Sequence, residues 1–261
     1  MTLASVRLGL NLVLAYRFEA LVKVLSASIV ALLNWCLWTA IFQGHTTIAG
    51  RTQAELTTYV VVAWVITTFY GTRVDEHLSA RFRTGDIGVD LIRPWSIQQH
   101  LYFRDLGRAS GALVLTTVPL ALWTGLLLPL RLPEHLWTLP CFLLSLFLAH
   151  AISFGFAWLV GIAAFALRNS SGLAHLKATL ISVFSGALIP LDLYPEPLRS
   201  WIMWLPLQGM SHTPADIFVE RHTPGELVTA IAVQGIWAGI LAIAGWWAFH
   251  KAVRNVVIQG G

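Results

Sequence analysis

The stretch RFRTGDIGVDLIRP, residues 81–94, lies between two long apolar runs and holds five ionisable side chains, three Arg and two Asp, in 14 positions. A charged side chain at the centre of a bilayer costs about 2.5–3.5 kcal/mol on insertion scales. The stretch therefore lies outside hydrocarbon, in water or against a soluble partner. Because it interrupts the apolar sequence, we expect the chain to cross a membrane on both sides of it.

The composition of the whole chain is that of a membrane protein. Apolar residues make up 56% of the 261 residues and charged residues only 11%, against about 25% in ordinary soluble domains. Residues 1–261 are therefore predicted to form a single transmembrane domain in the lipid bilayer. The net charge of +4 does not indicate a nucleic-acid partner, because the basic residues are distributed among loops.

Six apolar runs are candidates for spanning helices, since a bilayer core needs about 20 apolar residues per helix. They cover residues 21–42, 56–72, 109–130, 136–167, 172–191 and 227–249. The predicted fold is all-α, a polytopic membrane protein with six transmembrane helices. The run 172–191 is the weakest, because His175 and Lys177 lie in its first turns. We interpret Lys177 as a side chain that snorkels to the cytoplasmic surface; a substrate contact is the alternative.

The distribution of Lys and Arg orients these spans. With the N-terminus inside, 13 of the 17 basic residues fall on the cytoplasmic side and four outside. Both termini are therefore predicted to be cytoplasmic, with the chain in the cytoplasmic (inner) membrane. Residues 73–108 then form a cytoplasmic loop.

Two amphipathic segments accompany the spans. In residues 1–20, Arg7, Asn11 and Glu19 recur at multiples of four on an otherwise apolar helix, which is typical of a helix in the inner headgroup layer. Residues 192–226 are too short to cross the membrane and return as two full spans. We expect a re-entrant or interfacial hairpin there, between spans five and six.

Common catalytic motifs are missing from the sequence. It contains no GxxxxGK[ST] phosphate loop, no HExxH, no GxSxG and no paired cysteine ligands. The chain is therefore not expected to be an enzyme or to bind a cofactor or metal itself. His150 is the only ionisable residue near the middle of an apolar run. We interpret it as a packed, hydrogen-bonded side chain; a proton relay is the alternative.

Two blocks of sequence resemble a known family. The first, in the cytoplasmic loop, consists of Gly85-Asp86-Ile87, Asp90-Leu91 and Arg93-Pro94. The second is FSGALIPL at 184–191, followed by Tyr194-Pro195, Leu198, Leu205-Pro206 and Pro214. Over essentially its full length the chain resembles ABC-2-type transporter permeases of the six-span branch. It departs from their pattern at Asp192, where an apolar or aromatic residue is expected, and this leaves the depth of the outer hairpin open.

The resemblance implies a permease that forms a homodimer or a related heterodimer and pairs with two separate ABC ATPase subunits. ATP and magnesium would bind to those ATPase subunits. The resemblance also implies that the cytoplasmic loop couples the two proteins, through Gly85, Asp86, Ile87, Asp90, Leu91, Arg93 and Pro94.

The residues of this loop suit docking. Gly85 and Gly88 permit a tight turn and a short helix, and the sequence Arg93-Pro94 ends that helix because proline disfavours helix in the residue before it. Asp86 and Asp90 are expected to cap the short helix or to offset its dipole. A solvated connector is the alternative interpretation of the loop.

The second block predicts where cargo leaves. In a dimer, an exit region near the outer leaflet is expected to be lined by Phe184, Ser185, Gly186, Leu188, Leu191 and Trp201. The pair Ser185-Gly186 permits a bend or a close helix approach. Trp201 lies where an indole prefers the headgroup level, so a simple interfacial anchor is the alternative for it.

A GxxxG motif, Gly235 and Gly239, lies in the sixth span. It permits close approach of another helix, and packing within one subunit and a dimer seam both remain open.

The function predicted from these features is the membrane half of an ATP-driven exporter of hydrophobic or amphiphilic cargo. A secondary carrier or channel is the first alternative, but it would require ion-coupling residues within the spans. A membrane-embedded enzyme of lipid metabolism is the second. It would require converging acidic or histidine side chains, whereas the outer carboxylates are spread without metal-ligand spacing: Asp192, Glu196, Asp216, Glu220 and Glu226.

Overall fold

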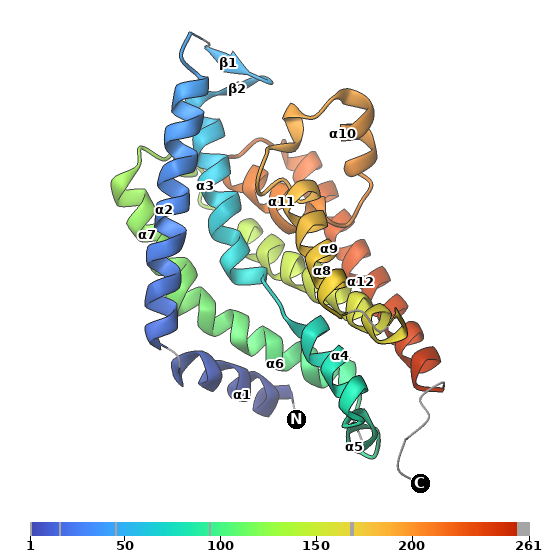
Figure 1. The fold of residues 1–261 in the computed structure, drawn as a ribbon. Helices are drawn as coiled ribbons and strands as arrows, with labels where there is room; N and C mark the ends of the chain where they lie inside the picture. The colour runs from blue at the N-terminus through green and yellow to red at the C-terminus, as the bar shows by residue number, and fades with distance from the viewer. Residues whose placement is uncertain (1, 16, 45, 94, 168–169, 255–261) are drawn as a thin grey trace.

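The computed structural model describes residues 2–15, 17–44, 46–93, 95–167 and 170–254, and most of them are helical (Figure 1). The first half comprises α1 (Thr2–Ala15), α2 (Arg17–Ile41), the antiparallel strands β1 (Thr47–Ile48) and β2 (Arg51–Thr52), α3 (Gln53–Tyr70), α4 (Val74–Thr84), α5 (Ile87–Leu91), α6 (Ile97–Ala112), the π-helical turn η1 (Leu113–Thr117) and α7 (Val118–Leu127). The second half comprises α8 (Thr138–Leu167), α9 (Ser170–Phe184), the 3-10 turn η2 (Leu191–Leu193), α10 (Glu196–Ile202), α11 (Gln208–Phe218) and α12 (Pro224–Arg254).

Among the described residues, four helices are long and apolar enough to cross a membrane. They are Leu21–Ile41, Ile97–Leu127, Thr138–Leu167 and Pro224–Arg254. The other two expected spans correspond to shorter helices, α3 with 18 residues and α9 with 15. The fold is therefore an all-α membrane protein.

The third expected span, residues 109–130, begins earlier than the hydropathy indicates. The helix starts at Ile97, after Ser96 accepts a hydrogen bond from the backbone N–H of Gln99 as its N-cap. It is continuous through η1 into α7. The π-helical turn directly precedes the first turn of α7, which contains Pro119, a residue that lacks the N–H of a regular ladder.

The fifth expected span, residues 172–191, ends earlier than predicted, at Phe184. Gly186 has a φ of 82°, in the left-handed region, and so cannot continue a right-handed helix. A Cβ at this position would lie 2.6 Å from the Tyr59 hydroxyl, so the close approach also requires glycine. Of the apolar residues that follow the helix, Ala187 and Leu191 are buried, whereas Leu188 and Ile189 are exposed.

The expected amphipathic helix 1–20 is present in part, as α1, whereas residues 17–20, with Glu19, belong to α2; residues 1 and 16 lie outside the described part of the chain. Helix α1 lies across the lower end of the molecule and packs along α6 (Figure 1). A Cβ at Gly9 would overlap the backbone of α6 at Arg104, and one at Gly107 would overlap the backbone of α1 at Val6. These two glycines therefore allow backbone contact between the helices.

Helices α3, α8 and α11 form the centre of the molecule. Most side chains of α3 are buried, and α11 is buried from Gln208 to Ile217. Gly209 in α11 lies against Ile152, halfway along α8, and against Gln234 of α12. Gln234 donates to the Gly209 carbonyl at 2.7 Å and accepts from the Ser145 hydroxyl at 2.8 Å. The segment after η2 is therefore inserted between the long helices.

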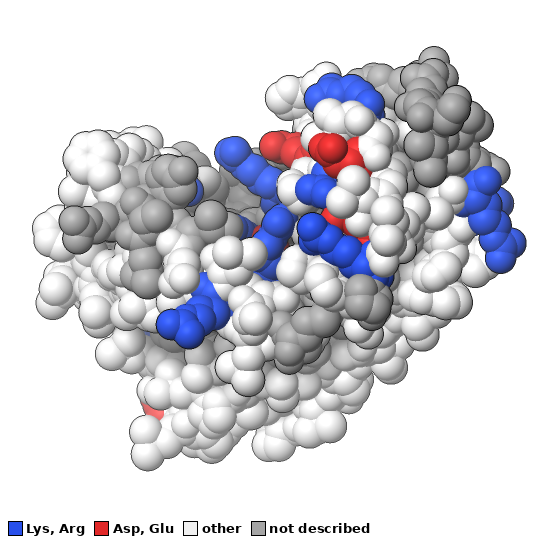
Figure 2. Space-filling model, turned by 90° about the horizontal axis from the view of Figure 1, so that it is seen from below, with Lys and Arg blue, Asp and Glu red and all other residues white. Residues whose placement is uncertain are grey.

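Two ends of the molecule can be distinguished in Figure 1. The loop end carries α1, α4, α5 and the end of α12, and the hairpin end carries β1, β2 and α10. Figure 2 views the molecule from below, where Lys and Arg side chains outnumber the Asp and Glu side chains in sight.

Candidate functional site

The predicted coupling loop is a helix–turn–helix at the loop end. Helix α4 ends at Thr84, and Gly85 follows in the left-handed conformation with a φ of 81°. The short helix α5 comes next, so the tight turn and short helix expected from the sequence are both present. Helix α5 ends at Leu91 with Ile92 as its C-cap. Pro94 lies outside the described residues.

Ion pairs hold this turn together. Arg81 of α4 pairs with Asp90 of α5 at 2.5 Å, and Arg93 lies 3.7 Å from the same carboxylate. Asp86 stands at the N-cap position of α5, but its side chain makes no cap bond and instead accepts from the Thr84 hydroxyl at 2.7 Å, so of the two expected roles of Asp86 and Asp90 side-chain capping is not the one seen at Asp86. Asp90 is buried by its pairing with the preceding helix.

The turn has a buried side and an exposed apolar side. Ile87 is fully buried with Leu78 and Phe82 of α4, so it anchors α5 to the rest of the protein. On the outer side Ile92 is 83% exposed, and Val89 and Leu91 are also exposed. These three residues form an apolar tip, and the exposed charged residues Asp86 and Arg93 flank them in the sequence.

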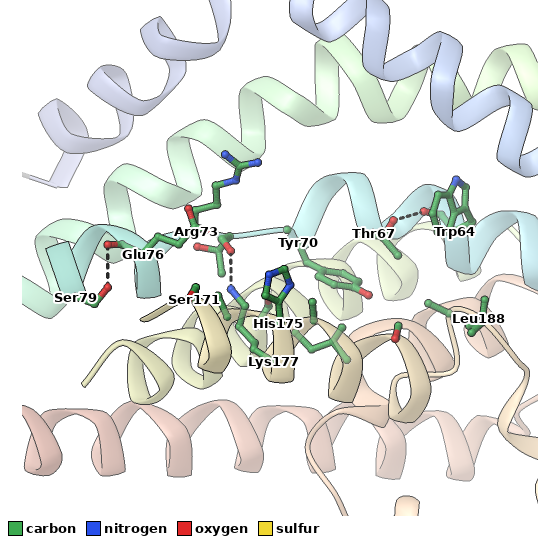
Figure 3. A pocket seen from close by; sticks show the side chains of 18 of the residues that line it. Trp64, Thr67, Tyr70, Arg73, Glu76, Ser79, Ser171, His175, Lys177 and Leu188 are labelled. Carbon is green, nitrogen blue, oxygen red and sulfur yellow. Dashed lines mark hydrogen bonds between the residues drawn. The ribbon is translucent and has the colours of Figure 1, made fainter. Parts of the chain in front are cut away.

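A cavity of about 740 Å³ lies next to this loop, between α3, α4 and α9 (Figure 3). Its loop-end mouth is polar and its inner part is apolar. The mouth is lined by Arg73, Glu76, Ser79, Arg83, Ser171, His175 and Lys177. The inner part is lined by Trp64, Ala178, Ile181, Ala187 and Leu188, among others.

Lys177 joins α9 to α4 at the edge of this cavity. Its ammonium group donates to Asp75 at 2.6 Å and to the Thr72 carbonyl at 3.2 Å. The Asp75 side chain is 2% exposed and that of Lys177 11%. The interpretation of Lys177 as a snorkelling side chain is therefore wrong, because an ion pair in the interior holds it.

The structure brings only one of the predicted path residues to the cavity. Leu188 lines it and is exposed. Phe184 packs against the main core, while Ser185, Gly186 and Leu191 are buried. Trp201 lies on α10 and is 77% exposed.

At the hairpin end, a buried charge cluster joins segments that are distant in the sequence. Arg51 is 0% exposed and pairs with both Asp192 and Asp216, the latter at 2.6 Å. Its guanidinium also lies 4.6 Å from the centre of the Tyr59 ring. His212 continues the cluster, 2.9 Å from the Tyr59 hydroxyl and 3.4 Å from Asp216.

Sequence reasoning missed this cluster, because Arg51 is 141 and 165 positions from its two acidic partners. The one available signal was Asp192, which departs from the family pattern. Its carboxylate is explained by Arg51, with Arg199 adding a second ion pair at 3.0 Å. Burial raises the pKa of Asp192, but the interactions with Arg51, His212 and Arg199 lower it by a larger amount. The pKa of Asp192 is therefore below its usual value.

Glu220 fastens the hairpin to the start of α8. It accepts hydrogen bonds from the Thr138 hydroxyl at 2.6 Å and from the backbone N–H groups of His135 at 2.8 Å and Glu134 at 3.1 Å. Burial raises its pKa, but these hydrogen bonds lower the pKa to about 2, so the side chain is ionised at neutral pH.

Two further expectations concerned the spans. His150 is packed between Tyr102 and Phe69, as expected, but neither ring nitrogen has a hydrogen-bond partner, so that part of the interpretation is wrong. At Gly235 and Gly239, an added Cβ would meet no atom within 4 Å. The GxxxG motif is therefore not used for packing within the described part of this subunit.

The side chains at these sites can bind charged and amphiphilic molecules and can dock a soluble partner. Within the described ranges, no group of three His, Cys, Asp or Glu side chains is placed to hold a metal ion.

The sequence model of the ABC-2 family transporter proteins matches residues 28–260. No curated protein and no solved structure matches the chain. Permeases of this family are transmembrane components that are not themselves catalytic, and they generally work with ATPase partners. The matched range contains the turn between α4 and α5, the cavity and the charge cluster described above. The chain therefore belongs to the ABC-2 transporter family and is a membrane-embedded permease of the ABC transport class.

Proposed function

We propose that this chain is the permease subunit of an ATP-driven exporter that moves a hydrophobic or amphiphilic substrate across the cytoplasmic membrane. Separate ATPase subunits dock on the turn between α4 and α5 and supply the energy. The observation that carries this proposal is the apolar tip of Val89, Leu91 and Ile92 on a turn held by the ion pair of Arg81 with Asp90. Exposed apolar side chains beside charged ones are typical of a protein interface.

A continuous set of contacts connects this docking surface to the cavity. Helix α4 leads directly from the turn to Asp75, and Asp75 pairs with Lys177 on α9 at 2.6 Å. On its other side α4 packs on α8, where a Cβ at Gly161 would lie 2.9 Å from Asp75. A push on α5 is therefore transmitted to the wall of the cavity as a movement of packed elements.

The assembly proposed for this permease contains a second permease subunit, identical or related, and two ABC ATPase subunits that hold the ATP and magnesium. Coupling through Gly85, Asp86, Ile87, Asp90, Leu91, Arg93 and Pro94 is supported by the exposed tip and by the rigid turn. Ile87 and Asp90 act there as internal anchors, since both are buried.

We also propose six crossings, with both termini cytoplasmic and a re-entrant outer hairpin. Helix α9 has 15 residues and rises only about 22 Å, less than the roughly 30 Å of a bilayer core. The outer hairpin is therefore needed at membrane depth, to fill the part of the bilayer core that α9 does not cross. Contact of Gly209 with the middle of α8 supports this, because irregular backbone is tolerated in a membrane only where protein buries it.

Replacing Ile92 by Asp is expected to lower cargo-stimulated ATP turnover of the complete transporter about tenfold or more. The substitution places an unpaired charge in the apolar centre of the docking surface, whereas the turn itself is held by other residues. Asp86→Arg and Arg93→Glu are expected to act in the same direction, because both side chains are exposed beside the tip. ATP hydrolysis by the purified complex is the measurement.

Ile92→Val is the matched control, since it keeps an apolar tip and should retain near-normal turnover. Expression and membrane insertion of all four variants should equal those of the parent protein. Normal turnover in Ile92→Asp, Asp86→Arg and Arg93→Glu would mean that the loop is only a connector.

The topology is tested by cysteine labelling in a background in which Cys36 and Cys141 are replaced by Ser. Glu196 and Ile92 are exposed and lie at opposite ends of the molecule. A membrane-impermeant maleimide is expected to label Glu196→Cys in intact cells, and Ile92→Cys only after the membrane is opened. The reverse pattern would overturn the proposed orientation. Arg51 is unsuitable for labelling because it is buried.

A further inference from the structure

The cavity between α3, α4 and α9 separates charge from apolar surface along its length. The residues at its loop-end mouth include Arg73, Arg83 and Lys177 as cations and Glu76 as the one carboxylate among the lining residues. Glu76 and Asp75, the partner of Lys177, offset two of these three positive charges, so the mouth keeps a net charge of +1. An anionic group is therefore favoured there.

Two of these cations are available to a ligand. Lys177 is engaged by Asp75, but Arg73 and Arg83 are exposed and are in no ion pair with any residue of the described ranges. The two arginines stand ten residues apart on α4, about 15 Å of helix rise, so they do not form one clamp. A single guanidinium binds a phosphate or carboxylate through two parallel hydrogen bonds, so either arginine suits an anionic headgroup. Ser171 and His175 add polar groups at the same mouth (Figure 3).

The other end of the cavity suits a hydrocarbon chain. Ala174, Ala178 and Ile181 recur at helical spacing on the face of α9 that lines it, and Trp64, Ala187 and Leu188 add apolar side chains, beside the hydroxyl groups of Thr67, Ser153 and Ser182. From Ser171 to Phe184 α9 rises about 20 Å, compared with about 15 Å for one leaflet of the bilayer core. The volume of about 740 Å³ lies within the range of roughly 300–1,000 Å³ that is common for ligand pockets.

We propose that this cavity binds an anionic amphiphile, with its headgroup at the loop-end mouth on the guanidinium of Arg73 or Arg83 and its chain directed toward Leu188, and that this is the chemical class of the cargo. The inference rests on the proposed function and narrows its substrate. The ligand enters at the loop end, where its head stays beside one of the free arginines while its chain lies along α9. Leu188 is the lining residue shared with the predicted exit region.

Binding is tested on the purified permease with two probes of equal acyl chain length, lysophosphatidylglycerol and lysophosphatidylcholine. Both carry a phosphate and the same acyl chain, but the choline of the second neutralises its net charge, whereas the glycerol of the first does not. We expect the anionic probe to bind at least tenfold more tightly, because a charge-assisted hydrogen bond is worth that factor or more. If the parent protein binds the two probes with equal affinity, the proposal is overturned, and no variant is needed to reach that result.

Three variants locate the binding. The double substitution Arg73→Gln with Arg83→Gln should remove the preference for the anionic probe. Arg254→Gln should leave the preference unchanged, since it removes an exposed positive charge of the same end that does not line the cavity. Ile181→Trp fills the apolar part and should weaken both probes about equally. An unchanged preference in the double variant would place the anion elsewhere.

A second arm distinguishes cargo from a resident membrane lipid. The complete transporter is placed in phosphatidylcholine vesicles, and its ATP turnover is measured with lysophosphatidylglycerol added from solution or with phosphatidylglycerol built into the bilayer. Stimulation by the added probe, absent in the double variant, supports the assignment as cargo. Binding without stimulation by the added probe overturns it. The binding measurement needs no ATPase, so its result does not depend on the proposed docking of ATPase subunits. A failure of that docking proposal is seen separately, as ATP turnover that the substitution Ile92→Asp leaves unchanged.

Discussion

Replacing Arg51 by Met is expected to destabilise the protein by about 3–5 kcal/mol, the usual consequence of removing one partner from a buried ion pair. The guanidinium is 0% exposed and is the shared partner of Asp192 and Asp216. Without it, two carboxylates lie in the interior close to the Tyr59 ring with no cation of equal proximity. In thermal unfolding of the detergent-purified protein, this corresponds to a fall in Tm of about 6–20 °C.

Arg199→Met is the matched control for this substitution. Arg199 also pairs with Asp192, at 3.0 Å, but its side chain is 37% exposed. Surface ion pairs contribute about 0–1 kcal/mol, so the control should lower Tm only slightly. If Arg51→Met were no less stable than Arg199→Met, the buried cluster would not hold the hairpin.

A triple variant separates the unpaired charges from the loss of packing. Arg51→Met combined with Asp192→Asn and Asp216→Asn removes all three charges together. Replacing a buried charge cluster by uncharged groups is often nearly neutral, so most of the lost stability should return. A triple variant as unstable as Arg51→Met would mean that the arginine acts through its packing on Tyr59 instead.

The amino-acid sequence predicts those parts of the fold that depend on local composition. The apolar runs, the charged loop at 81–94 and the short helix after Gly85 all follow from hydropathy and turn chemistry. The family match over residues 28–260 agrees with the resemblance carried by that loop and by the FSGALIPL block. These features are visible because each one is encoded within a few neighbouring residues.

Helix boundaries were less predictable, because tertiary contacts decide them. The helix that begins at Ile97 contains Arg104, Asp105 and Arg108, which hydropathy assigned to the loop. Asp105 and Arg108 pair at 2.8 Å, and α1 covers this part of the helix. At the other extreme, apolar sequence continued to residue 191 although Gly186 ends the regular backbone, and hydropathy contains no information about φ.

The candidate sites were predictable only in part for the same reason. The turn between α4 and α5 is local, and its conformation follows from neighbouring residues of the motif. The charge cluster and the cavity are assembled from segments far apart in the chain, so Arg51, Asp75, Arg73 and Arg83 carried no signal individually. Leu188 was found because it lies in the second sequence block, while Leu191 of the same block is buried.

Lys177→Met is expected to have the second large effect, on stability and on coupling together. It leaves Asp75, which is 2% exposed, without its ion-pair partner, and this should cost about 3–5 kcal/mol. It also removes the polar link from α4, which leads to the docking turn, to α9, which lines the cavity. Cargo-stimulated ATP turnover should therefore fall along with Tm. Lys251→Met, on the exposed end of α12, should change stability by no more than about 0.5 kcal/mol.

The double variant Lys177→Met with Asp75→Asn distinguishes a link in coupling from a purely structural pair. Removing both charges leaves no unpaired carboxylate in the interior, so Tm should return most of the way to that of the parent protein. Turnover should stay low, because α4 and α9 are no longer joined by the short contact of 2.6 Å between the ammonium and the carboxylate. Recovery of turnover together with Tm would mean that the pair only stabilises the fold, and that movement of the docking turn reaches the cavity through the packing of α4 on α8 at Gly161.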